Sequence, residues 1–243
     1  MTFLAVALIR ENYPDIPSVK VDLIKNIPVG AGLGGGSSDA AATLIGMNRL
    51  FNLEFDRAML TKLGAALGSD VPFFFSSGSA LVSGRGEIIE EIELPLDYHL
   101  ALITPPERVS TTEAYRILNR PQSAERDEDT GLTLFEGAST FYGSGTISDL
   151  LPALLGSGND FEDKFLEVND LQNSAEGVAE SLGLIRKQFR SLGSRLTRLS
   201  GSGSAVFGIF DSAVPHERLQ AVLREGWLAH SARPISLPAD SSP

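Results

Sequence analysis

The residues best suited to chemistry in this sequence form a glycine-rich loop over residues 30–38. Five of the seven positions from Gly30 to Gly36 are glycine, so the backbone can adopt positive φ angles and approach a ligand closely. Helical periodicity begins at Ser38 or Asp39, and the first N–H groups of a helix lack partners and favour negative charge. The loop therefore favours a phosphate chain, although it lacks the Lys-Ser/Thr ending of a P-loop. A flexible linker is the alternative interpretation.

Asp70 is the second candidate, in the segment Leu-Gly-Ser-Asp-Val-Pro-Phe over residues 67–73. It follows the predicted end of a helix and precedes an apolar run. A carboxylate at such a place could be partly desolvated, and could orient or deprotonate a substrate hydroxyl. The alternative is a turn aspartate that bonds to neighbouring backbone groups.

A second glycine- and serine-rich segment, residues 200–204, lies between two predicted strands. It could pack against the first glycine loop or face the phosphates, and the alternative is an ordinary hairpin turn. His99 lies within a strand pattern, and we interpret it as a residue of the sheet rather than of a catalytic site.

The elements that must position these residues follow from periodicity. Alternating apolar and polar residues over 18–27 predict a half-buried strand that leads into the loop. Residues 2–9 predict the latter part of a buried helix that begins without a capping residue. The pattern predicts further helices at 38–51, at 57–67 between an Asp56 cap and a Gly68 stop, and at 111–118, 161–168, 175–192 and 215–224. It predicts further strands at 71–75, 80–82, 87–92, 98–104, 196–199, 205–210 and 227–235, with mostly surface loop over 120–158.

Composition bounds the possible functions. The chain has 243 residues, with 20 Lys and Arg against 31 Asp and Glu, and 20 − 31 gives a net charge of −11. This balance argues against a nucleic-acid binder that uses a broad basic surface. The absence of cysteine excludes a disulfide scaffold and a thiolate nucleophile, and three scattered histidines argue against a histidine-rich metal site. No apolar run approaches the roughly 18 residues of a membrane helix. Strand pairs mixed with helices predict an α+β fold.

Several segments together resemble one family. Residues 28–41 are similar to the ATP-binding loop of the GHMP kinase superfamily, and residues 67–74 are similar to its catalytic-aspartate segment. Residues 109–115 resemble a stretch that lines the substrate site of one family within it, the 4-diphosphocytidyl-2-C-methyl-D-erythritol kinases. Residues 159–162 and 199–207 are similar to later markers of that family in the same order. The resemblance covers nearly the whole chain.

The resemblance implies both a fold and an activity. The fold would be two-lobed, with an N-terminal ATP-binding domain over 1–95, similar to domain 2 of ribosomal protein S5, and a ferredoxin-like C-terminal domain over 96–243. The activity would be transfer of the γ-phosphoryl group of ATP to a hydroxyl of 4-(cytidine 5′-diphospho)-2-C-methyl-D-erythritol, giving its 2-phosphate. This step belongs to non-mevalonate isoprenoid biosynthesis. The resemblance also implies Mg²⁺, a cytoplasmic location, and a monomer or homodimer.

Individual roles carry over by position. Asp70 would be the base or orienting group for the substrate hydroxyl. Thr111 and Tyr115 would line the cytidine end of the substrate, with Tyr115 as a stacking surface, and Ser37 would contribute to Mg²⁺. The loop that wraps the ATP phosphates would consist of Pro28, Val29, Gly30, Ala31, Gly32, Leu33, Gly34, Gly35, Gly36, Ser37 and Ser38.

The sequence departs from the family at its start. It shows neither the family's Lys-(hydrophobic)-Asn element, whose lysine pairs with the catalytic aspartate, nor its Gly-Tyr-His element, which helps to bind cytosine. Met1 falls within what resembles the helix that follows those strands, so the first strands of the fold are missing here. We expect either a start further upstream or a shortened relative in which Asp70 has no lysine partner. The alternatives are a GHMP kinase for another small alcohol, of the homoserine or mevalonate type, and an inactive nucleotide-binding remnant.

Overall fold

The computed structural model describes residues 1–94, 96–110, 116, 169 and 171–235, together with short strands at 124–126, 133–135 and 138–139. It divides into two compact units, one of Met1–Val29, Gly34–Leu94 and Ile235–Pro243, the other of Gly30–Leu33 and Pro95–Pro234. The helices expected at 161–168 and, except for residue 116, at 111–118 lie outside the described residues. Within the described ranges, no helix is long and apolar enough to cross a membrane.

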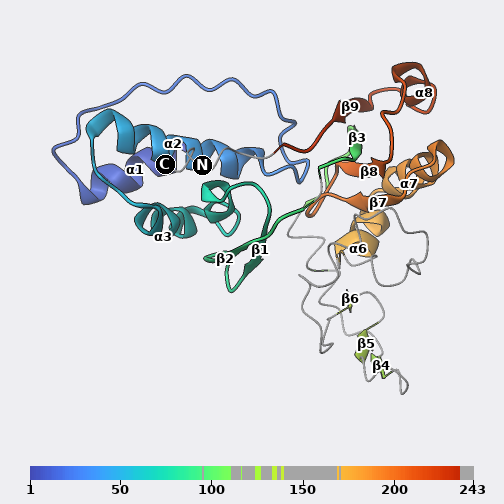
Figure 1. Ribbon diagram of the computed structural model, residues 1–243, viewed down its shortest axis with the longest axis horizontal. Coiled ribbons are helices and arrows are strands. Elements are labelled where there is room, and N and C mark those ends of the chain that lie inside the picture. The colour runs from blue at the N-terminus through green and yellow to red at the C-terminus, as the bar shows by residue number, and fades with distance from the viewer. Residues whose placement is uncertain are drawn as a thin grey trace. The chain divides into compact units, whose positions relative to one another are not determined.

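Three helices that pack side by side form the core of the first unit (Figure 1). They are α1 Thr2–Asn12, α2 Gly35–Phe51 and α3 Arg57–Leu67. The prediction of an uncapped helix at the start is confirmed, but the prediction that this helix is buried is wrong. Only one face of α1 reaches the other helices, so Phe3 remains 80% exposed. The shared core contains Ala5, Ile9, Ala40, Leu44, Leu60, Leu63, Val71 and Phe75.

The connection between α2 and α3 is held by two polar side chains. Asp56 accepts a hydrogen bond from the Met59 N–H at 2.8 Å and caps α3, and Gly68 ends it, as the sequence predicts. Buried Asn48 donates to the Phe55 carbonyl and accepts from the Phe55 N–H, both at 3.0 Å. These bonds fix the start of α3.

The strand expected over residues 18–27 is not present. The segment is extended but makes no backbone hydrogen bond to a described residue, and a strand requires such pairing. Its alternation is nevertheless real, because Lys20 and Asp22 form an ion pair at 3.0 Å on one side of the segment. Val21 and Leu23 are about half exposed, at 47% and 50%. The periodicity therefore predicted the side-chain directions but not the missing neighbour.

The strand expected at 71–75 is also wrong, since a 3-10 helix, η1 Pro72–Phe75, stands there. Pro72 has no N–H to donate to a sheet, and its fixed φ suits the first position of a helix. The next two predicted strands are confirmed as an antiparallel hairpin of β1 Ala80–Ser83 and β2 Ile88–Glu91.

The second unit contains a four-stranded antiparallel sheet in the order β7-β8-β3-β9. Along the chain, the strands of this sheet and the helices between them follow the order strand, helix pair, strand, strand, helix, strand. This order and topology confirm the ferredoxin-like prediction. The elements are β3 His99–Thr104, α6 Leu171–Val178, α7 Glu180–Leu192, β7 Leu196–Leu199, β8 Val206–Phe210, α8 His216–Gln220 and β9 Leu228–Ala232.

One sequence expectation for this unit needs correction. The single helix expected at 175–192 is two helices, because Ala179 between them has an extended backbone, with φ −137° and ψ 102°. Within the range expected to be mostly surface loop, three short strands pair in the order β4-β5-β6, which leaves that expectation untested for the rest of the range. They are β4 Ala124–Arg126, β5 Thr133–Phe135 and β6 Ala138–Ser139.

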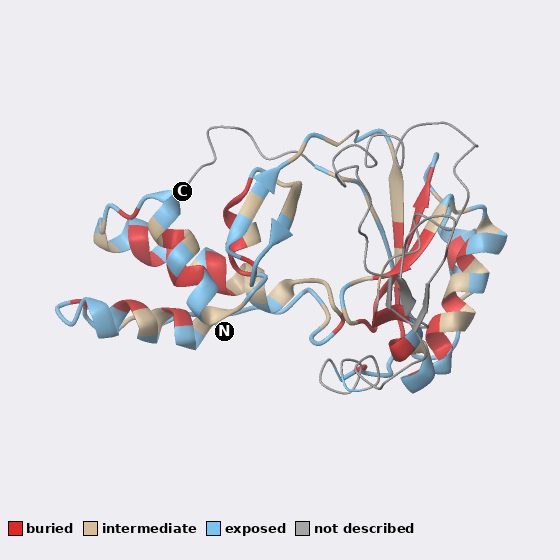
Figure 2. Cartoon of the chain, turned by 90° about the horizontal axis from the view of Figure 1, so that it is seen from below, coloured by how far each residue is buried: buried red, intermediate tan, exposed pale blue. Residues whose placement is uncertain are grey.

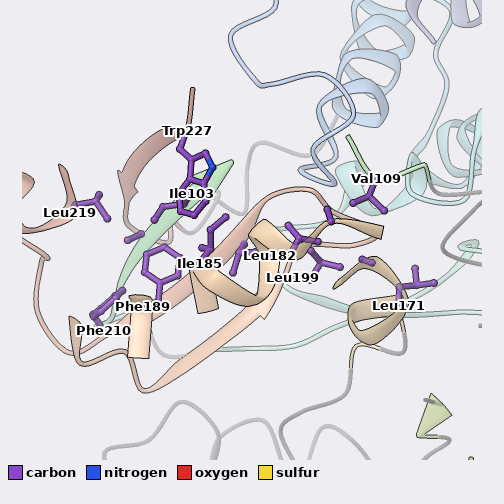
Figure 3. Close-up of a cluster of buried hydrophobic side chains, with 14 residues drawn as sticks. Ile103, Val109, Leu171, Leu182, Ile185, Phe189, Leu199, Phe210, Leu219 and Trp227 are labelled. Atoms are coloured by element: carbon purple, nitrogen blue, oxygen red, sulfur yellow. The ribbon is translucent and has the colours of Figure 1, made fainter. Parts of the chain in front are cut away.

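Helix α7 covers the sheet with its apolar side. Its buried residues Leu182, Ile185 and Phe189 face the strands (Figures 2 and 3). The rings of Phe189 and Phe210 meet edge to face, with centroids 5.9 Å apart. This core anchors β7 and β8, and so fixes the turn between them.

Candidate active site

The glycine-rich loop has the backbone geometry of an anion-binding turn. Gly30, Gly32 and Gly34 have φ angles of 76°, 73° and 66°, in the left-handed region that glycine adopts without strain. Gly34 caps α2, so the helix begins at Gly35 rather than at Ser38 or Asp39, the start that the sequence predicts. The Ser38 N–H donates to the Gly34 carbonyl at 2.9 Å and closes the first turn. The loop therefore runs directly into a helix N-terminus.

The N–H groups of this loop have no hydrogen-bond partner in the described part of the chain. From residue 30 to residue 37, no backbone N–H donates a hydrogen bond to another described residue. Consecutive N–H groups with glycines of positive φ form concavities that bind anions. The dipole of the 17-residue α2 adds partial positive charge at the same place. A flexible linker is not expected to combine unpaired N–H groups, glycines of positive φ and a helix N-terminus. The geometry therefore favours the phosphate-binding interpretation over the linker.

The second glycine-rich segment packs against the first. Ser200 Oγ donates to the Gly32 carbonyl at 2.8 Å, and the Ala205 N–H donates to the Ala31 carbonyl at 3.0 Å. The segment is also the hairpin turn between β7 and β8, so two of the three interpretations hold together. In a trans peptide the C=O and the next N–H point in opposite directions. The N–H groups of Gly32 and Leu33 therefore point away from the turn.

Asp70 lies in an exposed turn between α3 and η1. Its segment packs against the first turn of α2, because a Cβ on Gly34 would lie 2.9 Å from the Phe74 ring. The Met1 side chain lies beside both Gly36 and Gly68. A Cβ added to these glycines would lie 3.6 and 3.2 Å from it, respectively. The structure therefore brings the Asp70 segment and the end of the phosphate loop together.

Asp70 is exposed to solvent. The expectation that its carboxylate is partly desolvated is therefore wrong. Among the described residues, no side chain forms an ion pair or a hydrogen bond with its carboxylate. The carboxylate is thus open to a substrate hydroxyl.

An ion pair that the sequence did not predict lies beside the first turn of α2. Lys25 Nζ contacts Asp39 Oδ2, and the two side chains are 31% and 23% exposed. A Cβ on Gly35 would lie 3.7 Å from Lys25 Nζ, so this ammonium group is adjacent to the helix start. Both residues also line a cavity of about 690 Å³ whose other walls come mainly from α1 and from residues 18–29. The extended segment therefore contributes a charge next to the loop, although it is not a strand.

The two serines that begin α2 differ in their bonding. Ser38 Oγ donates to the Gly35 carbonyl at 3.0 Å, whereas the Ser37 hydroxyl has no partner among the described residues. Three or more His, Asp or Glu residues do not cluster as a metal site anywhere in the described part of the chain. Mg²⁺ beside a phosphate chain needs only one or two protein oxygens, so the Ser37 hydroxyl fits this role.

Several predicted markers lie outside the described residues, namely Thr111, Tyr115 and residues 159–162. His99 opens β3, which confirms it as a residue of the sheet. Sequence reasoning missed Asn169, whose amide bonds to the turn at residues 199–201. A signal was present, because residues 169–172 read Asn-Asp-Leu-Gln and repeat the pattern of the Asn-Asp-Phe-Glu marker at 159–162.

The sequence is similar to known kinases over most of its length. Residues 2–78 match the GHMP kinases N terminal domain. The chain is 33% identical over 219 residues to the 4-diphosphocytidyl-2-C-methyl-D-erythritol kinase of Thermodesulfovibrio yellowstonii, covering 89% of this chain and 71% of the relative. It is 34% identical over 224 residues to the kinase of the same name from Bacillus subtilis, covering 92% and 71%.

Solved structures agree with this similarity. A crystal structure of 4-(cytidine 5′-diphospho)-2C-methyl-D-erythritol kinase matches with a TM-score of 0.71 and 30% identity, covering 96% of this chain and 76% of that one. Homoserine kinase from Cytophaga hutchinsonii matches with a TM-score of 0.70 but only 15% identity, covering 97% and 75%. The latter match reflects the fold alone. Together they confirm the predicted α+β fold class.

Proposed function

The chain belongs to the 4-diphosphocytidyl-2-C-methyl-D-erythritol kinases, within the GHMP kinases, and we infer from this membership that it phosphorylates a small alcohol with ATP. The alcohol is 4-(cytidine 5′-diphospho)-2-C-methyl-D-erythritol, and the products are its 2-phosphate and ADP. Identity of about one third to relatives of this name, over about nine tenths of the chain, carries the inference. Homoserine and mevalonate kinases share only 14–15% identity, so the alternative alcohols have weaker support.

ATP binds through its phosphates to the glycine-rich loop in this proposal. The free N–H groups of residues 30–37 and the start of α2 provide donors and positive potential without a basic side chain in the loop itself. This explains how a chain with a net charge of −11 can hold a polyanion. Preorganised N–H groups also stabilise charge as it develops on the transferring phosphoryl group.

Asp70 positions the substrate hydroxyl and accepts its proton. The hydroxyl oxygen forms a bond to the γ-phosphorus while the bond from that phosphorus to the β–γ bridging oxygen breaks, and ADP leaves. The exposed carboxylate has no competing partner among the described side chains, and its segment packs on the first turn of α2. Catalysis consists mainly of in-line positioning and charge stabilisation.

Mg²⁺ would be held by the Ser37 hydroxyl together with phosphate oxygens. When bound, it would neutralise charge on the β- and γ-phosphates. Ser37 is half-buried in the first turn of α2, and its hydroxyl is free of the backbone bond that Ser38 makes.

The remaining assignments stay predictions. Thr111 and Tyr115 are proposed to line the cytidine end of the substrate, with the Tyr115 ring stacked on the base. A cytoplasmic location and a monomeric or homodimeric state also stay predictions.

A substrate panel tests the proposed function. The purified chain is given ATP with the cytidyl substrate, homoserine or mevalonate, and ADP release is measured against a reaction without alcohol. We expect release to depend on the cytidyl substrate. A folded sample that turns over another alcohol faster would overturn the substrate assignment. ATP binding without transfer to any alcohol would instead support the inactive remnant.

A further inference from the structure

We propose that Asn169 is a positioning residue for the nucleotide site. Its side chain holds the turn between β7 and β8, and this turn holds the phosphate loop. All of these residues belong to the second unit, which includes Gly30–Leu33. The inference rests on the proposed function only in assuming that the loop binds the phosphates of ATP.

The Asn169 amide bonds to the surrounding backbone through both its nitrogen and its oxygen. Nδ2 donates to the Leu199 carbonyl at 3.0 Å and to the Gly201 carbonyl at 2.8 Å. Oδ1 accepts from the Leu171 N–H at 3.1 Å, at the start of α6. One side chain therefore joins the beginning of a helix to both sides of Ser200. A residue that only capped the helix would need the oxygen but not the two donated bonds.

Further bonds fix the shape of the turn. Gln172 Oε1 accepts from the Leu199 N–H at 3.2 Å, and the Gln172 side chain belongs to the same helix, α6. Within the turn, the Gly203 N–H donates to the Ser200 carbonyl at 2.9 Å. The Ser200 N–H donates to the Ala205 carbonyl at 2.8 Å. Hydrogen bonds between its own residues therefore hold the turn, and so do the side chains of Asn169 and Gln172 at the start of α6.

The phosphate loop rests on this turn with no room to move toward it. A Cβ on Gly32 would lie 2.0 Å from the Ser200 carbonyl oxygen, and a Cβ on Gly201 would lie 3.3 Å from the Gly32 carbonyl oxygen. The bonded pair Ala31 and Ala205 is buried, at 2% and 0% exposure. A displacement of the turn therefore moves the loop, and with it the direction of the Gly32 and Leu33 N–H groups.

The variant Asn169→Asp separates this role from helix capping. Aspartate keeps the oxygen that accepts from Leu171 and is itself a favoured cap. It cannot donate, and its carboxylate would face two carbonyl oxygens. Asn173→Asp is the control, because this exposed residue of α6 makes no bond to a described residue and receives the same charge change.

Nucleotide binding is the first measurement, by calorimetry with a non-hydrolysable ATP analogue and Mg²⁺. We expect the Kd of Asn169→Asp to rise about tenfold, the scale of losing one or two hydrogen bonds, while Asn173→Asp retains the wild-type value. In turnover, KM for ATP should rise with KM for the alcohol unchanged. An unaltered Kd in Asn169→Asp would overturn the proposal. If the wild-type chain binds no analogue, the proposed function fails instead.

Two further measurements cover the case in which Asn169→Asp folds poorly. Ser200→Ala removes the bond to the Gly32 carbonyl and leaves the backbone of the turn in place, so we expect a similar loss of affinity. Amide hydrogen exchange of residues 199–205, without nucleotide, should be faster in Asn169→Asp than in Asn173→Asp. Equal exchange in the two variants, or wild-type affinity for the ATP analogue in Ser200→Ala, would contradict the positioning role of Asn169. This holds whether or not the chain is an active kinase.

Discussion

In the proposed mechanism, different single residues serve ATP binding and phosphoryl transfer. We assign Gly32 to binding, because its positive φ and its closeness to Ser200 set the shape of the loop. We assign Asp70 to the transfer step, because it lies outside the loop with its carboxylate exposed. Substitutions at the two positions should therefore change different kinetic constants.

Asp70→Asn should lower kcat by roughly a hundredfold or more, the usual effect of removing a general base. The Kd for ATP should remain within about twofold, because the substitution leaves the loop N–H groups in place. Steady-state kinetics and calorimetry measure the two quantities. Asp15→Asn, an exposed position in the same unit, is the control. An unchanged kcat in Asp70→Asn would remove this residue from the mechanism.

Gly32→Ala should weaken ATP binding by at least about tenfold. The new Cβ would lie 2.0 Å from the Ser200 carbonyl oxygen, and the left-handed backbone alone costs about 1–2 kcal/mol for a residue other than glycine. Gly46→Ala is the matched control, since a Cβ there, in the middle of α2, meets nothing within 4 Å. That control should stabilise the chain by up to about 1 kcal/mol. Wild-type affinity in Gly32→Ala would contradict the described loop.

At the scale of elements, the starts of α2 and α3 show how local sequence sets function. Asp56 caps the start of α3 with its own side chain, whereas the first N–H groups of α2, after Gly34, have no partner in the described ranges. A capped start stabilises the helix, and an open one is available to an anion. The starts of the two helices therefore differ in whether a side chain caps them, because of one residue type at each cap.

Elements with local signals were predictable, and those that depend on distant partners were not. Helix α3 was predicted to the residue because Asp56 and Gly68 mark its ends. The segment at 18–27 was mistaken for a strand because alternation reports side-chain directions and not a neighbouring strand. The same limit applies to the site. The glycine loop could be predicted from its composition. The hydrogen bonds from Asn169 could not, because their partners Leu199 and Gly201 lie 30 and 32 positions further along the chain.

An ion pair between Arg57 of α3 and Glu91 of β2 joins the β1–β2 hairpin to α3. This interaction should make the free energy of unfolding depend on pH. The Ser77 hydroxyl, and after it the Arg57 guanidinium, lower the pKa of Glu91 below the usual value of a carboxyl group. A lowered folded-state pKa means that the interaction stabilises the chain above the unfolded-state pKa. This stabilisation is lost as the pH falls toward the folded-state value.

We therefore expect Glu91→Gln to be less stable than wild type at neutral pH, by an amount that shrinks as the solution is acidified. Urea unfolding at a series of pH values measures this difference. Glu90→Gln, an exposed neighbour on the same strand, should show no such convergence with wild type. A gap between Glu91→Gln and wild type that stays constant into acid would contradict the pKa shift.

For the whole molecule, the proposed site residues are divided between the two compact units. The hairpin turn of the second unit holds the loop backbone at Gly30–Leu33, while α2 and Asp70 belong to the first unit. Each unit has its own apolar core, and these cores explain how distant segments of the chain are held in place. The ferredoxin-like topology was predicted only through the resemblance to a family, because strand order depends on long-range pairing.

Product analysis by ³¹P NMR tests the central claim most directly. The chain is incubated with ATP, Mg²⁺ and 4-(cytidine 5′-diphospho)-2-C-methyl-D-erythritol, and the phosphorus resonances are followed over time. We predict a new phosphomonoester signal that grows in step with ADP while the cytidine diphosphate signals persist. A folded, ATP-binding chain that yields only inorganic phosphate, or no new signal, would contradict the assignment as this kinase.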